Sequence, residues 1–250
     1  MYTLKKQLGQ HFLRDENICR KIVEHLQQHP FQRLLEVGPG GGALTKYLLQ
    51  LPGVDLKAVE LDAEKVQWLL QQYPALQGRL IHKSFLDLEA PFALPFTIIG
   101  NFPYNISTQI LFHILTWRPA VECVVGMFQK EVAQRVAAAP GSKTYGVMSV
   151  LVQAYFNTEY LFEVHENCFN PPPKVKSAVI RLLPRTDTPA MRSDADFLKL
   201  VKAAFNQRRK MLRNALKALF DEHILQDALF GKRAEQLSVN DFAALTFKMK

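Results

Sequence analysis

The sequence contains no long apolar segment. No uninterrupted apolar run approaches the roughly 18 residues that a membrane-spanning helix requires. The opening residues, MYTLKKQLGQHFL, lack the apolar core of a secretory signal peptide, and neither internal repeats nor low-complexity segments occur. We therefore expect a globular cytoplasmic protein that has no membrane partner.

Cysteine is scarce as well. The three cysteines, Cys19, Cys123 and Cys168, are odd in number and far apart, and none shares a metal-ligand spacing with a histidine pair. This usage argues against a disulfide framework and against a zinc site. We expect free thiols and no bound metal.

Acidic residues are few in the last third of the chain. Residues 1–170 carry 15 basic and 15 acidic side chains, whereas residues 171–250 carry 16 and 8, so the whole net charge of +8 lies there. Such asymmetry indicates a polyanionic partner, with nucleic acid the first candidate and an acidic membrane surface the second. On charge alone, a basic face that is merely solvated is an equal alternative.

From residue 15 to about residue 182, helical and strand patterns alternate, which predicts a mainly parallel sheet covered on both sides. An apolar content of 48% is sufficient for a core of that size. A short proline-rich loop joins the last two strands, which we expect to pair antiparallel at one edge. The seven predicted strands are 33–37, 56–61, 79–82, 96–100, 122–128, 159–164 and 177–183.

The pattern changes after residue 184. Residues 184–194 are polar, contain two prolines and predict a linker. Only helical patterns follow, at 194–205, 209–220 and 238–249, and Ser238 with Asp241 fits a capping box at the start of the last one. We expect a first domain over residues 1–184 and a small, basic, all-helical domain over residues 185–250.

A glycine-rich turn, EVGPGGGALT (36–45), follows the first predicted strand. Gly38, Gly40 and Gly42 let the backbone turn tightly and approach a ligand closely. Glu60 ends the next strand, 18 residues after Gly42, where a carboxylate can accept hydrogen bonds from both hydroxyls of a ribose. The spacing is not that of a dinucleotide-binding turn or a P-loop. With Glu36 ahead of the glycines, it resembles motif I of S-adenosylmethionine-dependent methyltransferases.

A polar and aromatic cluster, GNFPYN (100–105), follows the fourth predicted strand, at the edge where open α/β sheets bind ligands. The side-chain oxygen of Asn101 and the carbonyl of Pro103 can accept hydrogen bonds from the exocyclic amine of a nucleobase and aim its lone pair at a methyl group. Tyr104 can stack on that base once it has left its helix or loop. The alternative is a turn whose aromatic residues, Phe102 in particular, pack into the core.

Seven segments match one known family in order and spacing. They resemble the ribosomal RNA adenine N6,N6-dimethyltransferases of the KsgA type, and the resemblance covers essentially the whole chain. It implies a Rossmann-like class I methyltransferase fold, α/β with a mainly parallel seven-stranded sheet, and a small all-α C-terminal domain. The segments are GQHFL (9–13), EVGPGGGALT (36–45), ELD (60–62), GNFPYNIST (100–108), QKEVAQRV (129–136), YGVMSVLVQ (145–153) and FNPPPKVKSAVIRL (169–182).

The resemblance also implies an activity. A monomeric enzyme would use S-adenosyl-L-methionine to dimethylate two adjacent adenosines at N6. These lie in the 3′-terminal hairpin of 16S ribosomal RNA, on a nearly mature small (30S) ribosomal subunit, which gives the enzyme a role in subunit biogenesis. The implied catalytic residues are Asn101, Pro103, Tyr104 and Phe169, with Phe169 stacking on the flipped adenine opposite Tyr104.

Cofactor contacts are implied in the same way. His11 and Leu13 would contact the methionine end. Gly38 and Gly40 would contact the carboxylate region, and Glu60 the ribose. The remaining implied contacts are Leu61, Ser84, Phe85 and Asn101.

Two positions depart from the family pattern. His11 stands where relatives often have asparagine, a change that keeps a hydrogen-bond donor. Ser84 stands where many relatives have an aspartate that binds the adenine amino group of the cofactor, and it lacks the carboxylate charge. Asp87 could replace that aspartate only if its loop were rearranged.

The segment NQRRKMLRNAL (206–216) supports an RNA partner independently. A continuous helix would place Arg209 and Arg213 one turn apart on a shared surface, with Met211, Leu212, Ala215 and Leu216 facing inward. Cations grouped in this way can bind phosphates without reading sequence, although any one of them can simply be solvated. The predicted RNA-binding residues are Arg208, Arg209, Lys210 and Arg213.

Two other functions stay open at this point. A macrolide-resistance type methylase, which resembles this family, would act on large-subunit RNA instead. From a different class, a non-catalytic RNA-binding assembly factor or transcription factor could retain the methyltransferase fold, and the Ser84 departure gives that reading some weight.

Overall fold

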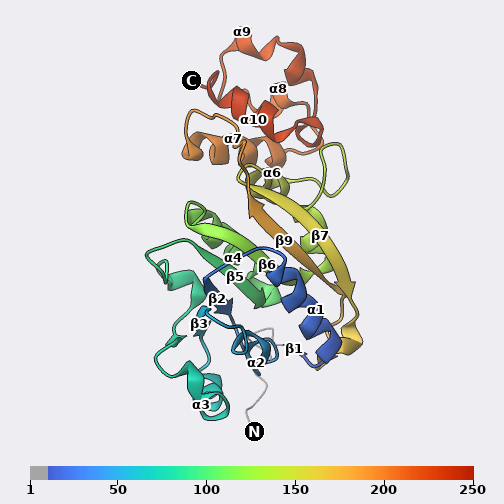
Figure 1. The fold of residues 1–250 in the computed structure, drawn as a ribbon. Coiled ribbons are helices and arrows are strands. Elements are labelled where there is room, and N and C mark those ends of the chain that lie inside the picture. The colour runs from blue at the N-terminus through green and yellow to red at the C-terminus, as the bar shows by residue number, and fades with distance from the viewer. Residues whose placement is uncertain (1–10) are drawn as a thin grey trace. The chain divides into compact units, whose positions relative to one another are not determined.

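The structure, a computed structural model, describes residues 11–250 (Figure 1). The chain divides into two compact units. Unit 1 comprises Met1–Ala133 and Glu159–Pro184, and unit 2 comprises Gln134–Thr158 and Arg185–Lys250. The sequence-based division at residue 184 therefore needs one change: residues 134–158 join the C-terminal segment, because helix α6 (Val147–Gln153) packs on α7 (Asp194–Asn206).

A seven-stranded sheet with the order β4-β3-β2-β5-β6-β9-β7 contains all seven predicted strands (Figure 1). The pairs β3–β4, β2–β3, β2–β5 and β5–β6 are parallel, and β9 runs antiparallel to β6. The mainly parallel sheet is thus confirmed, with β9 and β7 at one edge as expected. Its strands are β2 (Arg33–Val37), β3 (Asp55–Glu60), β4 (Leu80–His82), β5 (Phe96–Asn101), β6 (Val121–Gln129), β7 (Phe156–Val164) and β9 (Ser177–Pro184).

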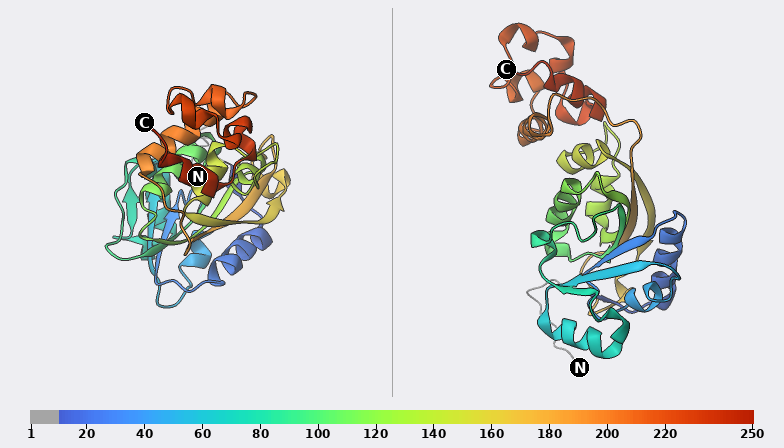
Figure 2. Two further views of the ribbon diagram at one scale, coloured as in Figure 1. Left: turned by 90° about the horizontal axis from the view of Figure 1, so that it is seen from above. Right: turned by 60° about the vertical axis from the view of Figure 1, so that its left-hand side comes forward.

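Helices cover both faces of this sheet, which explains why its central strands are continuously apolar (Figure 2). On one face, Val125 and Met127 of β6 share a buried cluster with Ile22 of α1 (Glu16–Gln27). On the other face, the ring of Phe96 lies 5.9 Å from that of Trp117, which follows α4 (Ser107–Thr116). Neighbouring residues of a buried strand therefore both find apolar partners.

A second, two-stranded sheet was not predicted. Strand β1 (Phe12–Leu13) pairs antiparallel with β8 (Phe169–Asn170), so that Phe12 faces Asn170 and Leu13 faces Phe169. Two-residue strands carry no periodicity that a sequence pattern can reveal. This sheet joins the beginning of the described chain to the segment that precedes the proline-rich loop.

Unit 2 is helical, but its helices differ from those predicted. Helix α7 begins after Ser193, whose hydroxyl accepts from the amide of Asp196 at 3.0 Å, and α10 has the predicted capping box between Ser238 and Asp241. The helix predicted over residues 209–220, on which the shared surface of Arg209 and Arg213 depended, does not form as one helix. Helix α7 ends at Asn206, residues 207–210 form a turn, and α8 (Leu212–Ala215) is a single turn.

The break in that segment is explained by hydrogen bonds to a distant part of the chain. Met211 forms an isolated antiparallel bridge with Arg233, and the amide of Leu212 donates to the carbonyl of Lys232 at 2.9 Å. These backbone groups are therefore satisfied across the unit instead of along a helix. Leu212 and Leu216 are buried as predicted, whereas Met211 is 49% exposed, against the prediction.

The other helices are α2 (Thr45–Leu48), α3 (Ala63–Gln72), α5 (Lys130–Val136) and α9 (Glu222–Leu225). Across residues 11–250, none of the helices has the length and apolar character needed to cross a membrane. Cys19, Cys123 and Cys168 are free thiols. Within the same described residues, no group of histidine, cysteine and acidic side chains is arranged to hold a metal ion.

Candidate active site

A cavity of about 800 Å³ lies in unit 1, where β2, β3, β4 and β5 end. Its walls are formed by residues that follow these four strands and by the segment that contains β1. Asn101 and the glycine turn line the same cavity, as the sequence analysis required. The predicted site residues that line it are His11, Leu13, Gly38, Gly40, Glu60, Leu61, Ser84, Phe85, Asn101, Pro103 and Tyr104.

The glycine turn forms one wall and depends on its glycines. Gly40 has a φ of +57°, and a Cβ there would lie 3.1 Å from the Phe12 ring. Gly38 has a φ of +65°, with no atom within 4 Å of the position of a Cβ, so its backbone borders open space. A ligand can therefore approach the backbone at Gly38 without meeting a side chain.

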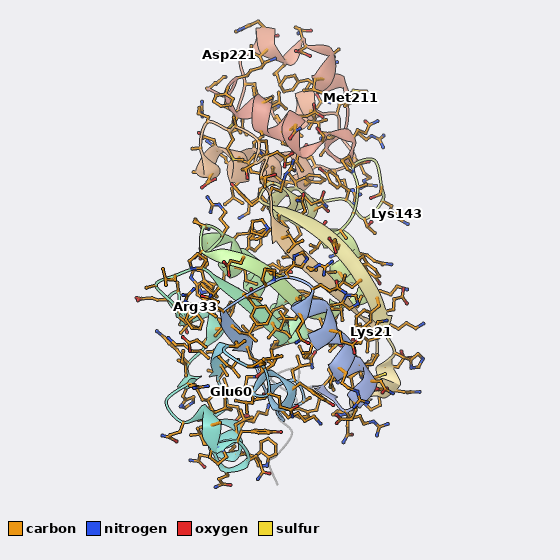
Figure 3. The ribbon with its side chains drawn as sticks, viewed as in Figure 1. Lys21, Arg33, Glu60, Lys143, Met211 and Asp221 are labelled. Carbon is orange, nitrogen blue, oxygen red and sulfur yellow. The ribbon has the colours of Figure 1, made fainter. Side chains whose placement is uncertain are left out.

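Glu60, at the end of β3, is held rigidly at this wall (Figure 3). It is 7% exposed. One carboxylate oxygen accepts from the amides of Leu61 and Asp62 at 2.9 and 3.0 Å, and the other accepts from the amide of Gly40 at 3.1 Å. A carboxylate oxygen can accept more than one hydrogen bond, so Glu60 can also receive hydroxyls of a ligand.

Glu36, at the end of the neighbouring strand β2, is fully buried below the turn. The hydroxyl of Thr45 donates to it at 2.8 Å. Burial raises the pKa of Glu36 to about 8, the charge of Glu60 adds to this rise, and the Thr45 hydrogen bond opposes it. Glu36 is therefore largely protonated at neutral pH.

The side-chain amide of Asn101, the last residue of β5, is held by a backbone group of His11. Its Nδ2 donates to the carbonyl of His11 at 3.1 Å. This bond fixes the orientation of the amide group, whose oxygen is its only acceptor and can receive a hydrogen bond from a ligand amine. Phe102, the next residue, is buried against Phe128, with ring centroids 4.8 Å apart, so the core position considered for it is confirmed.

Pro103 and Tyr104 follow at the cavity wall. The hydroxyl of Ser107 donates to the carbonyls of Pro103 and Tyr104 at 3.0 and 3.1 Å. The hydroxyl of Tyr104 is hydrogen-bonded to that of Ser177, and burial raises the pKa of Tyr104 while this bond opposes the rise. The imidazole of His11 packs on the Tyr104 ring at a centroid distance of 5.5 Å.

Ser84, which stands where relatives often have aspartate, lines the cavity. Its side chain accepts from the amide of Leu86 at 3.2 Å and so caps the short 3-10 helix Phe85–Asp87. Asp87 is exposed and does not line the cavity, so it does not replace the missing carboxylate. Phe85 is buried edge-on against Trp117, with ring centroids 5.2 Å apart.

Phe169 does not lie where the stacking role requires. Its side chain is completely buried in the core cluster that contains Leu13, its partner across the two-stranded sheet. It does not line the cavity, whereas the next residue, Asn170, does. The aromatic face expected opposite Tyr104 is thus turned into the core, because β8 presents alternate residues to opposite sides.

Sequence reasoning also missed residues that shape the cavity. The Phe12 ring lies against Gly40, and the ammonium of the buried Lys65 is 4.8 Å from the centre of that ring. Ser107 and Ser177 were missed too. Lys65 comes one turn after the ELD segment, and Ser107 follows NFPYNI directly, so closeness to recognised motifs was the available signal.

The four basic residues predicted to bind RNA are not equivalent. Arg208 donates to the carbonyl of Lys143 at 2.5 Å and pairs with Glu235 at 3.4 Å, all within unit 2. Lys143 is labelled in Figure 3. Arg209, Lys210 and Arg213 are exposed and make no ion pair with any described residue.

Two solved structures with a similar fold are named as a dimethyladenosine transferase and an rRNA methyltransferase. A dimethyladenosine transferase from Plasmodium falciparum matches with a TM-score of 0.80 at 24% identity, covering 93% of this chain and 94% of that one. The 23S rRNA methyltransferase ErmE matches with a TM-score of 0.74 at 23% identity, covering 95% and 99%. At these identities the likeness establishes the fold alone, which is the predicted Rossmann-like class I methyltransferase fold.

Sequence comparison goes further. The chain is 52% identical over 246 residues to the ribosomal RNA small subunit methyltransferase A of Cytophaga hutchinsonii, covering 97% of this chain and 95% of that protein. It is 49% identical to the protein of the same name from Phocaeicola vulgatus, covering 97% and 88%. Residues 1–248 match the family described as ribosomal RNA adenine dimethylase. The chain therefore belongs to the ribosomal RNA adenine dimethylase family.

Proposed function

We propose that this enzyme methylates two adjacent adenosines at N6 in the 3′-terminal hairpin of 16S ribosomal RNA. As a member of its family it is an S-adenosylmethionine-dependent ribosomal RNA adenine dimethyltransferase. Relatives named for the small ribosomal subunit support the 30S particle as the substrate. The enzyme acts as a monomer in the cytoplasm, where subunits are assembled. The observation that carries the proposal is that Asn101, the glycine turn and Glu60 line one cavity.

The residues of the cavity fit S-adenosyl-L-methionine. The open backbone at Gly38 and Gly40 accommodates the methionine end, and Glu60 accepts the ribose hydroxyls. Leu61, Ser84 and Phe85 also line the cavity, and we assign them to the adenine ring of the cofactor. When bound, the cofactor supplies a methyl group on a positively charged sulfur. Neutral Glu36 beneath the turn can ionise in response to such a charge.

The residues after β5 handle the target amine. The amine of adenine is a weak nucleophile because its lone pair is delocalised into the ring. The side-chain oxygen of Asn101 and the carbonyl of Pro103 accept its two hydrogens and hold the nitrogen in a pyramidal geometry. Tyr104 stacks on the flipped base. Phe169 does not stack on the base, because its ring is buried in the core. It instead helps to hold β8 in place.

Unit 2 supplies affinity for the ribosomal RNA. Its residues include 15 basic and 8 acidic side chains, against 16 and 15 in unit 1. Arg209, Lys210 and Arg213 are the exposed cations that we assign to phosphate contacts, while Arg208 holds the turn that carries two of them. Contacts of this kind position the substrate and do not read its sequence.

The test measures methyl incorporation from labelled cofactor into small subunits that lack the modification. Wild-type enzyme should produce dimethyladenosine, and Asn101→Ala should produce essentially none. Asn157→Ala, an exposed asparagine on β7 far along the chain from the motif, is the matched control and should behave as wild type. Incorporation into isolated large subunits instead would support the macrolide-resistance type reading. Equal incorporation by Asn101→Ala and wild type would refute the role given to Asn101.

A further inference from the structure

Ser107 uses its hydroxyl as a donor to the turn that precedes its helix. It is the first residue of α4 and is 1% exposed. A hydroxyl at a helix start usually accepts from amides of the first turn, but the start of α4 has no side-chain cap. Ser107 instead donates backwards to the carbonyls of Pro103 and Tyr104, at 3.0 and 3.1 Å. The hydroxyl of Ser107 therefore binds the two residues Pro103 and Tyr104, which we call the catalytic turn.

A second buried serine holds the same turn from another element. Ser177 is the first residue of β9, is completely buried, and faces Gln129 across the sheet. Its hydroxyl is hydrogen-bonded to that of Tyr104. Ser107 thus holds the backbone carbonyl of Tyr104, and Ser177 holds the hydroxyl at the end of its ring. Two neighbouring residues at the cavity wall are held at three points by two serines.

The two held groups differ in what they leave to a ligand. The carbonyl oxygen of Pro103 accepts from the hydroxyl of Ser107 at 3.0 Å and from the amide of Ile106 at 3.3 Å, so the amine of the base competes there with the longer bond, that from Ile106. The hydroxyl tip of Tyr104 is bound in the interior while the residue lines the cavity. Ser107 therefore fixes the direction of the Pro103 carbonyl, and Ser177 restrains Tyr104 from the side that faces away from the cavity.

We propose that Ser107 and Ser177 are positioning residues for methyl transfer. Ser107 sets the direction of the Pro103 carbonyl, and Ser177 sets the plane of the Tyr104 ring, before the adenine enters. This inference rests on the proposed function, because it assigns to the adenine the two groups that the serines hold. A displacement of about 1 Å in such groups can cost on the order of 100-fold in rate.

The first test compares kinetics with cofactor binding and stability. Ser107→Ala should lower kcat on unmodified small subunits about 10- to 100-fold, while calorimetric affinity for S-adenosylmethionine changes less than twofold. Ser149→Ala is the matched control, because Ser149 is also completely buried and donates to a backbone carbonyl, that of Arg135, in unit 2. The control should lose a similar amount of thermal stability and keep its kcat.

The second test is independent of whether Ser107→Ala folds. Tyr104→Phe and Ser177→Ala each break the same hydrogen bond, so each should raise KM for the subunit about three- to tenfold, and the double variant should be no worse than either single one. Additive effects would overturn the role of Ser177.

The outcomes separate the inference from the proposed function. Methylation by wild type together with an unimpaired kcat for Ser107→Ala, at the stability of the Ser149→Ala control, would show that Ser107 is merely structural. Absence of methylation by wild type itself would refute the proposed function, and the positioning roles with it.

Discussion

The two units of this protein fix their charged and polar groups in different ways. Around the cavity of unit 1, Glu36 and Glu60 are buried, and hydrogen bonds hold both carboxylate oxygens of Glu60 and one of Glu36. In unit 2, Arg209 and Lys210 are exposed on a turn and make no ion pair with a described residue. Unit 1 thus controls geometry and unit 2 supplies charge. Substitutions should have steep, local effects in the first and graded, salt-dependent effects in the second.

The largest expected difference concerns the buried carboxyl of Glu36. Its pKa of about 8 in the folded protein exceeds its ordinary value of 4.5, so the folded state keeps a proton that the unfolded state has lost. The free energy of unfolding of wild type should therefore fall as pH rises from about 4.5 to 8. Glu36→Gln should remove this fall. At pH 9 its free energy of unfolding should exceed that of wild type by an amount on the order of 4 kcal/mol.

Denaturant unfolding at pH 5, 7 and 9 measures this effect. The control is Glu235→Gln in unit 2, whose carboxylate is partly exposed and pairs with Arg208 at 3.4 Å. Its pH dependence should stay close to that of wild type. An identical pH dependence for Glu36→Gln and wild type would contradict the burial of a protonated carboxyl below the glycine turn.

Close packing beneath the catalytic turn predicts the next effect. A Cβ on Gly126 of β6 would lie 2.3 Å from the Phe102 ring and 2.7 Å from the Phe128 ring. Gly126→Ala should destabilise the protein by about 3 kcal/mol and reduce methylation, because Phe102 must move and is bonded to Asn101. Gly146→Ala in unit 2, where the nearest atom would be 4.0 Å away, should leave the melting temperature almost unchanged.

Removal of the Glu60 side chain should act mainly on the cofactor. Glu60→Ala leaves the amides of Gly40, Leu61 and Asp62 without their acceptor and removes the proposed ribose contact. We expect a loss of cofactor affinity of about 2–3 kcal/mol, close to 100-fold, in titration calorimetry. Glu122→Ala, an exposed acid on β6, serves as the control and should bind normally. Normal binding by Glu60→Ala would remove that residue from the site.

Exposed cations of unit 2 should give the smallest effect. Arg209→Ala should weaken binding to small subunits by about 0.5–1 kcal/mol and reduce the slope of log affinity against log salt by about 1, with no change in stability. Arg208→Ala should instead lower the melting temperature slightly, since it releases Lys143 and Glu235. Equal salt slopes for Arg209→Ala and wild type would exclude a phosphate contact at that residue.

The sequence was most informative where one physical signal dominated. Strands such as Phe96–Asn101 are continuously apolar because both faces of the sheet are covered, and each was found within a few residues. The glycine turn and Asn101 could be placed at one edge because parallel strands end together. The shared edge of the parallel strands therefore predicted that the glycine turn and Asn101 lie close together, and both line the cavity.

The sequence was least informative where partners come from distant segments. The helix over residues 209–220 was predicted from local pattern, but backbone groups of Met211 and Leu212 pair with residues near 232. The family resemblance implied that Phe169 stacks on the base, yet its pairing with Leu13 directs its ring into the core. Both errors arise because tertiary hydrogen bonds overrule local preference.

The pairing of Phe12 with Asn170 has a consequence for synthesis of the chain. Every recognisable cofactor motif has been translated once residue 105 is added, but the wall that contains His11 and Phe12 gains its partner strand only after residue 170 has been added. Contacts between segments so far apart form late, since a long loop must close first. A nascent or truncated chain that ends before residue 170 would therefore carry the motifs of the enzyme without a complete cavity wall.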